Sequence, residues 1–245
     1  MKFNIVTIFP NELMRSLNYG VIGNAINDNK IRIDCHDPRI HADNKHNSID
    51  DKPYGGGPGM VMQAEPVLKS IQQARNGDIN IPVVFLSPQG KTFNQDKAKE
   101  LSKLDEIIIV SSRYEGLDQR AIDQTDNHEE LSIGEYILSG GETACAVVID
   151  SISRLIPGVL GDRESILEES FSDGLLEYPH YTRPPEVNGD KVPEILLSGD
   201  HQKINQWRRV QSLKNTYLKR PDLIDRSNLC EDEIEIIDAI KNDPE

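Results

Sequence analysis

The sequence predicts an α/β domain with a mainly parallel sheet, followed by a smaller helical region. Short runs of β-branched and apolar residues alternate with amphipathic segments from residue 2 to about residue 156. Such alternation is typical of βαβ units, in which a helix connects each strand to the next parallel strand. From about residue 193 onward only helical periodicity remains.

Five segments open the first domain. KFNIVTIF (2–9) is β-branched and apolar, which predicts a buried first strand. A helix follows over 10–25, because proline suits its first turn and apolar residues recur at a spacing of three to four. IRID (31–34) predicts a second strand, AEPVLKSIQQA (64–74) a helix, and VVFL (83–86) a third strand.

The same alternation continues to the end of the domain. NQDKAKELSKL (94–104) predicts a helix, and IIIV (107–110) predicts a strand buried on both faces. LDQRAIDQ (117–124) predicts a helix and ELSI (130–133) a short strand. GETACAVVIDSISRLI (141–156) predicts a long apolar helix, which the following Pro-Gly pair ends.

The C-terminal part has a different character. Residues 157–192 lose periodicity and are rich in glycine and proline, which indicates a linker and the entry to a second unit. Residues 199–220 predict one long helix with Asp200 as its N-cap, and 230–241 predict an acidic final helix. The predicted organisation is a first domain over 1–160, a flexible linker over 161–180 and a helical domain over 181–245.

Composition excludes several classes of protein. No run of about 18 apolar residues occurs, so no membrane span is expected, and Pro10 interrupts the N-terminal apolar run too early for a signal peptide. Cys35, Cys145 and Cys230 lie far apart without a C-x-x-C pair, which fits the reducing cytoplasm and argues against a disulfide scaffold. The histidines form no H-x-x-x-H pair, so no metal site is expected, while a magnesium requirement stays open.

The charge distribution bears on partners. The chain carries a net charge of −14, which by itself argues against nucleic acid. Residues 183–220, however, carry eight bases and four acids between the acidic stretches 160–180 and 221–245. This basic segment fits phosphate binding, although a solvated helix face would carry the same charges. For Trp207 within it, a core anchor is the favoured interpretation over stacking on a base.

A glycine-rich stretch, KPYGGGPGM (52–60), raises the question of phosphate binding. A P-loop requires lysine and serine or threonine after its last glycine, whereas Gly59 is followed by Met60. Taken alone, the stretch indicates a surface turn. It nevertheless closes a long irregular segment, 35–63, of a kind that usually has a function within a compact domain.

Three loops that follow predicted strands share glycine, serine and either proline or tyrosine. They are LSPQGKTF (86–93), SSRYEGLD (111–118) and SIGEYILSGGE (132–142). Because ligands bind at the carboxyl ends of parallel strands, three such loops together favour one ligand pocket. Ordinary turns between strands and helices use the same residues, so each loop alone would be weak evidence.

Seven motifs together resemble the bacterial tRNA (guanine-37-N1)-methyltransferase family, the TrmD family. They are LSPQG, RYEG, SIGEYILSGGE, SRLIPGVLG, PHYTRP, LLSGDH with the tryptophan that follows, and DDKPYGGGPGM, in the order and spacing of the family. The resemblance runs from the first strand to about residue 225. It implies a SPOUT-type parallel sheet with a deep trefoil knot, plus a small C-terminal all-helical domain that binds tRNA.

The resemblance also implies an activity and partners. The reaction would transfer methyl from S-adenosylmethionine to N1 of guanine 37 in tRNA, in the cytoplasm. The protein would be an obligate homodimer with active sites built across the interface. The donor-binding residues would be Leu86, Ser87, Pro88, Ser112, Tyr114, Glu115, Gly116, Ile133, Gly134, Glu135, Tyr136, Ile137, Leu138, Gly140 and Gly141.

The catalytic residues implied by the resemblance are Glu169 and Arg154. The family has an aspartate general base where this chain reads EESF, so Glu169 takes its place, with Glu168 as a less favoured substitute. Ser112 stands where a glycine is common, and GGETAC lacks the proline of the usual GGELPA. Asn47 replaces a common arginine.

Two other functions compete with methyl transfer. The departures from the family pattern leave room for a nucleotide- or RNA-binding module without catalysis. An unrelated α/β phosphate-binding enzyme is the third possibility, and the missing lysine after the glycine-rich stretch argues against it.

Overall fold

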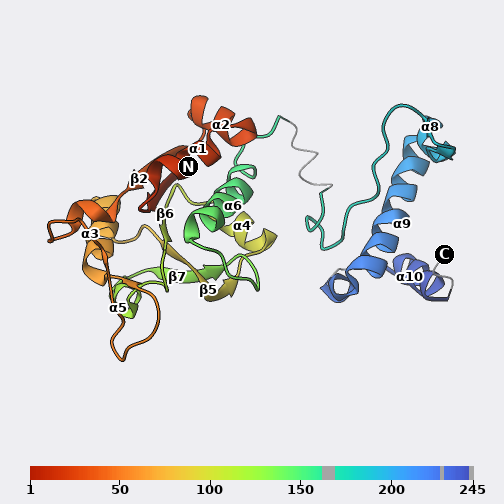
Figure 1. Ribbon diagram of the computed structural model, residues 1–245. Coiled ribbons are helices and arrows are strands. Elements are labelled where there is room, and N and C mark those ends of the chain that lie inside the picture. Colours follow the sequence, from red (N-terminus) through yellow and green to blue (C-terminus); the bar gives the residue numbers. More distant parts are fainter. Residues whose placement is uncertain (162–168, 227–228, 243–245) are drawn as a thin grey trace. The chain divides into compact units, whose positions relative to one another are not determined.

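The computed structural model describes residues 1–161, 169–226 and 229–242, and the chain divides into two compact units, Met1–Gly161 and Asp162–Glu245 (Figure 1). Each unit is described by itself below. No helix in the described part of the chain is long and apolar enough to cross a membrane.

The first unit is built on a parallel five-stranded sheet with the strand order β2-β1-β6-β5-β7. In the central strand, the side chains of Ile107, Ile108 and Ile109 are 0% exposed, so the prediction of a strand buried on both faces is confirmed. The strands are β1 (Lys2–Val6), β2 (Arg32–His36), β5 (Val83–Thr92), β6 (Glu106–Ser111) and β7 (His128–Ser132).

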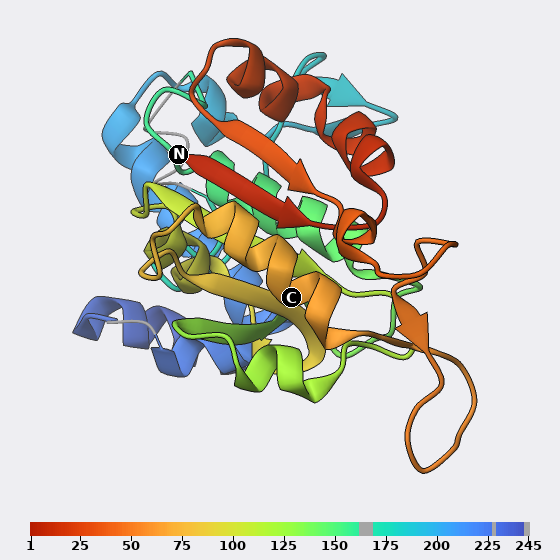
Figure 2. The ribbon, with the colours of Figure 1, turned by 90° about the vertical axis from the view of Figure 1, so that its left-hand side faces the viewer.

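Helices cover both faces of this sheet (Figures 1 and 2). Alternate strand residues such as Ile5 and Ile109 pack against one helix layer, while Val6 and Ile108 pack against the other. The first layer consists of α1 (Pro10–Leu17), α2 (Gly20–Asn27), α4 (Gln95–Leu101) and α6 (Gly141–Ser153), and the second of α3 (Ala64–Arg75) and α5 (Gln119–Asp123). The predicted mixed α/β architecture with a parallel sheet is therefore confirmed.

The single helix predicted over 10–25 is wrong, because the chain forms α1 and α2 with a break between them. Asn18 ends α1, and Gly20 adopts a φ of +59°, which is left-handed and favours glycine. The backbone at Gly23 then approaches Asn18 closely, since a Cβ there would lie 2.9 Å from the Asn18 carbonyl carbon. The apolar spacing of three to four continued through the break and concealed it.

Strand β5 is longer than predicted and contains an irregularity that shapes the site. Its register against β7 shifts between Leu86 and Lys91, and both residues pair with Leu131. Gly90 allows the close approach, because a Cβ there would lie 2.5 Å from the Leu131 nitrogen. The intervening residues 87–90 bulge out of the ladder within β5, so the first paired part of the strand ends at Leu86.

The irregular segment 35–63 contains short elements that periodicity did not reveal. A 3-10 helix, η1, spans Pro38–His41, and β3 (Asp50–Asp51) pairs antiparallel with β4 (Val61–Met62). The glycine-rich stretch 52–60 is the loop of this hairpin, and it stands out from the unit in Figure 2, in orange.

The second unit centres on helix α9 (His201–Lys219), with α8 (Glu194–Leu197), η2 (Pro221–Arg226) and α10 (Glu231–Asn242) around it. The predicted N-cap is confirmed, because the Asp200 side chain accepts a hydrogen bond from the Lys203 backbone nitrogen at 3.2 Å.

The expectation of an all-helical second domain is wrong at one place. Strands β8 (Glu186–Val187) and β9 (Asp190–Lys191) form a hairpin. Its turn is Asn188–Gly189, and both residues have positive φ, at +54° and +94°. An Asn-Gly turn is the strongest short hairpin signal, and strands of two residues are too short to show alternation.

The core of the second unit contains Leu175, Leu213 and Ile237. Trp207 is half-buried, and its ring centroid lies 6.4 Å from that of Tyr181. It is not part of the core cluster formed by the described residues, so its predicted role as a core anchor is wrong. The buried face of α9 instead runs through Ser212, Leu213 and Thr216, all of which lie further along the helix than Trp207.

Part of the expected linker over 161–180 packs on α9. The Leu176 backbone nitrogen donates to Thr216 Oγ1 at 2.9 Å, and Asn215 Nδ2 donates to the Glu177 carbonyl at 2.9 Å. Together with the burial of Leu175, these bonds make residues 175–177 a packed element of the second unit.

Candidate functional site

A cavity of about 380 Å³ opens at the carboxyl ends of β5, β6 and β7. The three loops that follow these strands form its walls, as expected for a ligand site in a parallel sheet. Its lining residues are Leu86, Ser87, Pro88, Ser112, Tyr114, Glu115, Gly116, Leu131, Ser132, Ile133, Gly134, Tyr136, Ile137, Leu138, Gly140, Gly141 and Ala144.

The structure brings together all but one of the residues expected to bind the donor. Only Glu135 is absent from the lining of this cavity, and it is exposed. Leu131, Ser132 and Ala144 line the cavity without having been predicted. Their signal was position alone: Ser132 begins the predicted loop 132–142, Leu131 directly precedes it, and Ala144 follows it by two residues in α6.

The three loops are packed backbone to backbone. Ser112 Oγ donates to the Leu86 carbonyl at 3.3 Å, and the Gly141 nitrogen donates to the Ser112 carbonyl at 2.8 Å. A Cβ at Gly141 would lie 2.9 Å from the Ser111 Cα atom, so the third loop approaches the second only because it has glycine there. Ser112 thus joins all three walls of the cavity.

A buried ion pair fixes the third loop to the second. Arg113 Nε donates to Glu142 Oε2 at 2.7 Å, and Arg113 Nη1 donates to the Ser139 carbonyl at 3.2 Å. Thr7 Oγ1 donates to the other carboxylate oxygen of Glu142 at 2.9 Å. The Arg113 guanidinium also lies over the Phe9 ring, 4.5 Å from its centroid.

Sequence reasoning missed this pair. The available signal in the sequence was Glu142, an acid in the first turn of a mostly apolar helix. In the structure its side chain is only 10% exposed. A carboxylate so deeply buried is retained only with a partner, so an arginine nearby could have been expected.

The glycine-rich hairpin is attached to the second loop. The Met62 nitrogen donates to the Gly116 carbonyl and the Glu115 nitrogen to the Met60 carbonyl, both at 2.9 Å. Gly59 has a φ of +79°, and a Cβ there would overlap the Glu115 carboxylate. The stretch 52–60 is therefore more than a surface turn, because its end forms part of the framework of the cavity.

Tyr114 connects the same two segments. It has a φ of +60°, which is uncommon for a residue with a side chain. Burial raises the pKa of the Tyr114 hydroxyl, and the Asp50 carboxylate that it faces raises this pKa further. Asp50 also accepts a hydrogen bond from Ser48 Oγ at 2.8 Å, so the strand before the glycine-rich loop is held from both sides.

The predicted catalytic residues lie in different units. Arg154 is the half-buried C-cap residue of α6 in the first unit. Glu169 belongs to the second unit, where its carbonyl accepts a hydrogen bond from the Ser172 nitrogen at 3.1 Å. Glu168, the less favoured substitute, lies outside the described residues.

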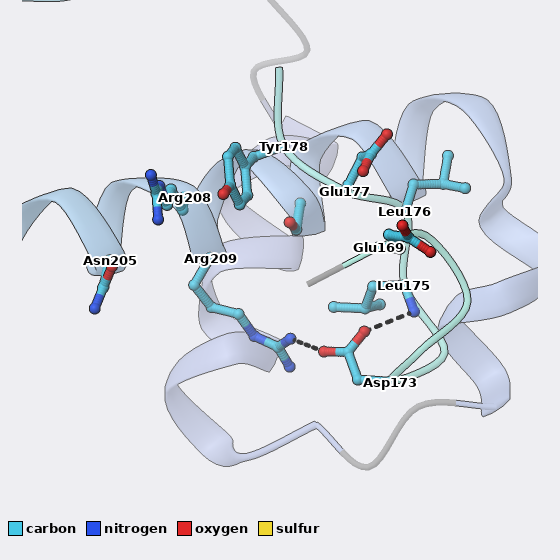
Figure 3. Close-up of a pocket in the computed structure, with 10 residues that line it drawn as sticks. Glu169, Asp173, Leu175, Leu176, Glu177, Tyr178, Asn205, Arg208 and Arg209 are labelled. Carbon is cyan, nitrogen blue, oxygen red and sulfur yellow. Dashed lines mark hydrogen bonds and ion pairs between the residues drawn. The ribbon is translucent and has the colours of Figure 1, made fainter. Parts of the chain in front are cut away.

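Glu169 lines a second, smaller cavity of about 210 Å³ against helix α9 (Figure 3). The Arg208 guanidinium lies over the Tyr178 ring there, 4.7 Å from its centroid. Arg209 forms ion pairs with Asp173 and, at 2.6 Å, with Glu233 of α10. The site thus combines a carboxylate with guanidinium groups from the basic helix.

A metal centre has no support in the described ranges, where no group of three or more histidine, cysteine, aspartate or glutamate side chains could hold an ion.

Comparison with known proteins identifies the family. The family model described as tRNA (Guanine-1)-methyltransferase TrmD matches residues 1–226. The chain belongs to the TrmD family. This confirms the resemblance seen in the seven sequence motifs, and the match includes both cavities of this TrmD-family chain.

Curated relatives of the TrmD family match nearly the whole chain, and each is named tRNA (guanine-N(1)-)-methyltransferase. The relative from Buchnera aphidicola subsp. Schizaphis graminum is 52% identical over 240 residues, covering 98% of this chain and 91% of the relative. The relative from Clostridium perfringens strain 13 is 48% identical over 237 residues, covering 97% of this chain and 99% of the relative. The relative from Pseudoalteromonas atlantica is 45% identical over 242 residues, covering 98% of this chain and 91% of the relative.

Two departures from the TrmD-family pattern fit the structure of this chain. Ser112, at a common glycine position, uses its hydroxyl to bond the first loop, as described above. Ala144, at the position of the missing proline, lines the cavity within the first turn of α6 and is 7% exposed. Both side chains are small enough to leave the cavity open.

Proposed function

We propose that this chain transfers the methyl group of S-adenosylmethionine to N1 of guanine 37 in tRNA, in the cytoplasm. The observation that carries the proposal is the cavity formed by three strand-end loops, in a chain of the TrmD family. The names of the curated relatives, which include guanine N1 methylation of tRNA, support the same reaction.

The cavity suits the proposed donor in size and lining. Its volume of about 380 Å³ falls within the range of roughly 300–1,000 Å³ that is typical of small-molecule sites. Leu86, Ile133 and Leu138 offer apolar walls for a base and ribose, and Gly140 and Gly141 leave backbone groups accessible. When bound, S-adenosylmethionine supplies a methyl group on a positively charged sulfur.

The residues of the chain would manage the proton and the charge on guanine. N1 of guanine carries a proton, which must leave as the new carbon–nitrogen bond forms and the carbon–sulfur bond breaks. We assign Glu169 as the base that takes this proton, a role that contributes roughly 10²–10⁴-fold to a rate. Arg154 would stabilise negative charge that develops on the guanine O6 atom.

The proposed function includes a finer architecture. We propose a trefoil knot in the first unit, a tRNA-binding role for the second unit, and a homodimer whose active sites are built across the interface. The match to the TrmD family model and the parallel sheet are consistent with such a knotted fold. The basic helix α9, with its guanidinium groups beside Glu169, supports the tRNA-binding role.

A labelled methyl-donor assay tests the function. We expect transfer to tRNA with guanine at positions 36 and 37, and none to the same tRNA with adenine at position 37. Mapping of the product should place the methyl group on N1. Donor binding without transfer would instead support a binding module without catalysis.

A further inference from the structure

The ring of Tyr54 has no place in the chemistry proposed above. Tyr54 is 97% exposed, more than any other large hydrophobic side chain in the described part of the chain. It lies in the loop between β3 and β4 that stands out from the first unit in Figure 2. An aromatic ring is a large apolar surface with a polar end, which suits it to contact with another molecule.

The loop around Tyr54 stands clear of the rest of the chain. Gly55, Gly56 and Gly57 follow it, with φ values of +83°, +78° and +130°. A Cβ at Gly55 or Gly56 would meet no atom within 4 Å. These glycines are therefore not needed for packing within the chain, and their lack of side chains leaves the surroundings of the tyrosine ring open.

The base of the loop, in contrast, is fixed. Met60 and Met62 exchange backbone hydrogen bonds with Glu115 and Gly116, which line the donor cavity. Gly59 packs against the Glu115 side chain. An exposed aromatic ring is thus carried on a segment that is anchored beside the cavity.

Two cationic side chains, Lys52 and Arg120, belong to the loop or to the segment that is bonded to its base. Lys52 lies two residues before Tyr54 and is exposed. Arg120 forms an ion pair with Asp118 at 2.6 Å. The Asp118 nitrogen donates to the Met62 carbonyl at 2.9 Å, so Arg120, in the first turn of α5, lies two residues after one that is bonded to the base of the loop.

From these observations we propose that Tyr54 is a stacking platform for an unpaired base of the RNA substrate, with Lys52 and Arg120 near its phosphates. Aromatic rings flanked by cations are the common means of binding single-stranded nucleic acid, because every base has a face that can stack. The proposal rests on the proposed function, since a tRNA presents unpaired bases in its anticodon loop.

Substitution of Tyr54 tests the proposal in the full-length protein. We expect Tyr54→Leu to raise KM for tRNA by roughly 5- to 150-fold, since stacking of a base contributes about that factor, while Tyr54→Phe stays within about twofold of wild type. KM for S-adenosylmethionine should not change in either variant. Ile79→Ala is the control, because Ile79 is 62% exposed and lines neither cavity.

A direct readout of stacking complements the kinetics. An anticodon stem–loop with 2-aminopurine in its loop should lose fluorescence on binding wild-type protein and much less on binding Tyr54→Leu. An unchanged KM for tRNA in Tyr54→Leu would overturn the proposal, and so would a change in oligomeric state, which would assign the ring to contact with a second copy. Failure of the wild-type protein to methylate tRNA would instead count against the proposed function.

Discussion

Gly140 lies directly against the guanidinium of Arg113, so closely that a Cβ at this position would overlap the Arg113 Nε atom. The same guanidinium is held by Glu142, whose side chain is 10% exposed, and by the Ser139 carbonyl. Arg113 therefore cannot move aside without breaking bonds inside the protein. The closure of the third loop on the second depends on the absence of a side chain at Gly140.

The first prediction concerns Gly140→Ala. Overpacking costs typically about 1–3 kcal/mol, so this variant should bind S-adenosylmethionine roughly tenfold or more weakly. Isothermal titration calorimetry measures the loss directly. Gly161→Ala is the control, because a Cβ at Gly161 would meet no atom within 4 Å. Equal affinities of the two variants would show that the Arg113 contact does not shape the site.

The second prediction separates backbone strain from contact in the glycine-rich loop. Gly56 and Gly59 have nearly the same φ, +78° and +79°, so alanine strains both positions alike. Only at Gly59 would the new Cβ overlap Glu115. Gly59→Ala should therefore lower methyl transfer at subsaturating donor by about tenfold or more, whereas Gly56→Ala should change it little. Similar losses in kcat/KM for the two variants would contradict this assignment.

The third prediction addresses the proposed base. Glu169→Gln keeps the size of the side chain but cannot accept the proton, so single-turnover methyl transfer should slow by roughly 10²–10⁴-fold. Glu169→Asp should retain much of the rate, and Glu194→Gln, an exposed acid of the same unit, should retain all of it. A wild-type rate in Glu169→Gln would remove this residue from the mechanism.

The fourth prediction concerns the ion pair between Arg209 and Glu233. Burial alone would raise the pKa of Glu233, but hydrogen bonding and charge from Arg209 outweigh it and lower the pKa below its ordinary value of 4.5. A lowered folded-state pKa stabilises the fold above the unfolded value, and this contribution disappears as pH falls through the folded value. Glu233→Gln should thus destabilise the second unit at pH 7 by about 1 kcal/mol, since the pair is partly exposed, and by less near pH 3.

Urea unfolding of the full chain, followed by tryptophan fluorescence, measures this effect. Trp207 is the one tryptophan of the sequence and belongs to α9, so the signal reports on the second unit. Glu235→Gln, on the same helix but exposed, should not change the urea concentration at the midpoint of unfolding. A destabilisation of Glu233→Gln that does not shrink at low pH would argue against the ion pair as its cause.

The sequence predicted the parallel sheet and a cavity formed by its strand-end loops, for a shared physical reason. Buried strands such as 107–110 need continuous apolar residues, and the strand-end loops of a parallel sheet meet at one edge. Local residue patterns were therefore sufficient to predict the strands and the meeting of their loops. The break at Gly20 and the register shift after Leu86 escaped prediction, because each depends on a close backbone approach rather than on periodicity. Trp207 was misjudged since size alone does not decide which face of a helix is buried.

The hydrogen bond between Thr7 and Glu142 has a consequence for biosynthesis. It joins residues 135 positions apart, and the central strand β6 enters between β1 and β5 only after both have been made. A chain emerging from the ribosome therefore carries an unpaired edge of β1 until residues 106–111 appear, and the lining of the strand-end cavity is incomplete until α6 begins. Folding that waits for such distant partners is intrinsically slow, because the entropy of closing long loops is lost before the contacts form.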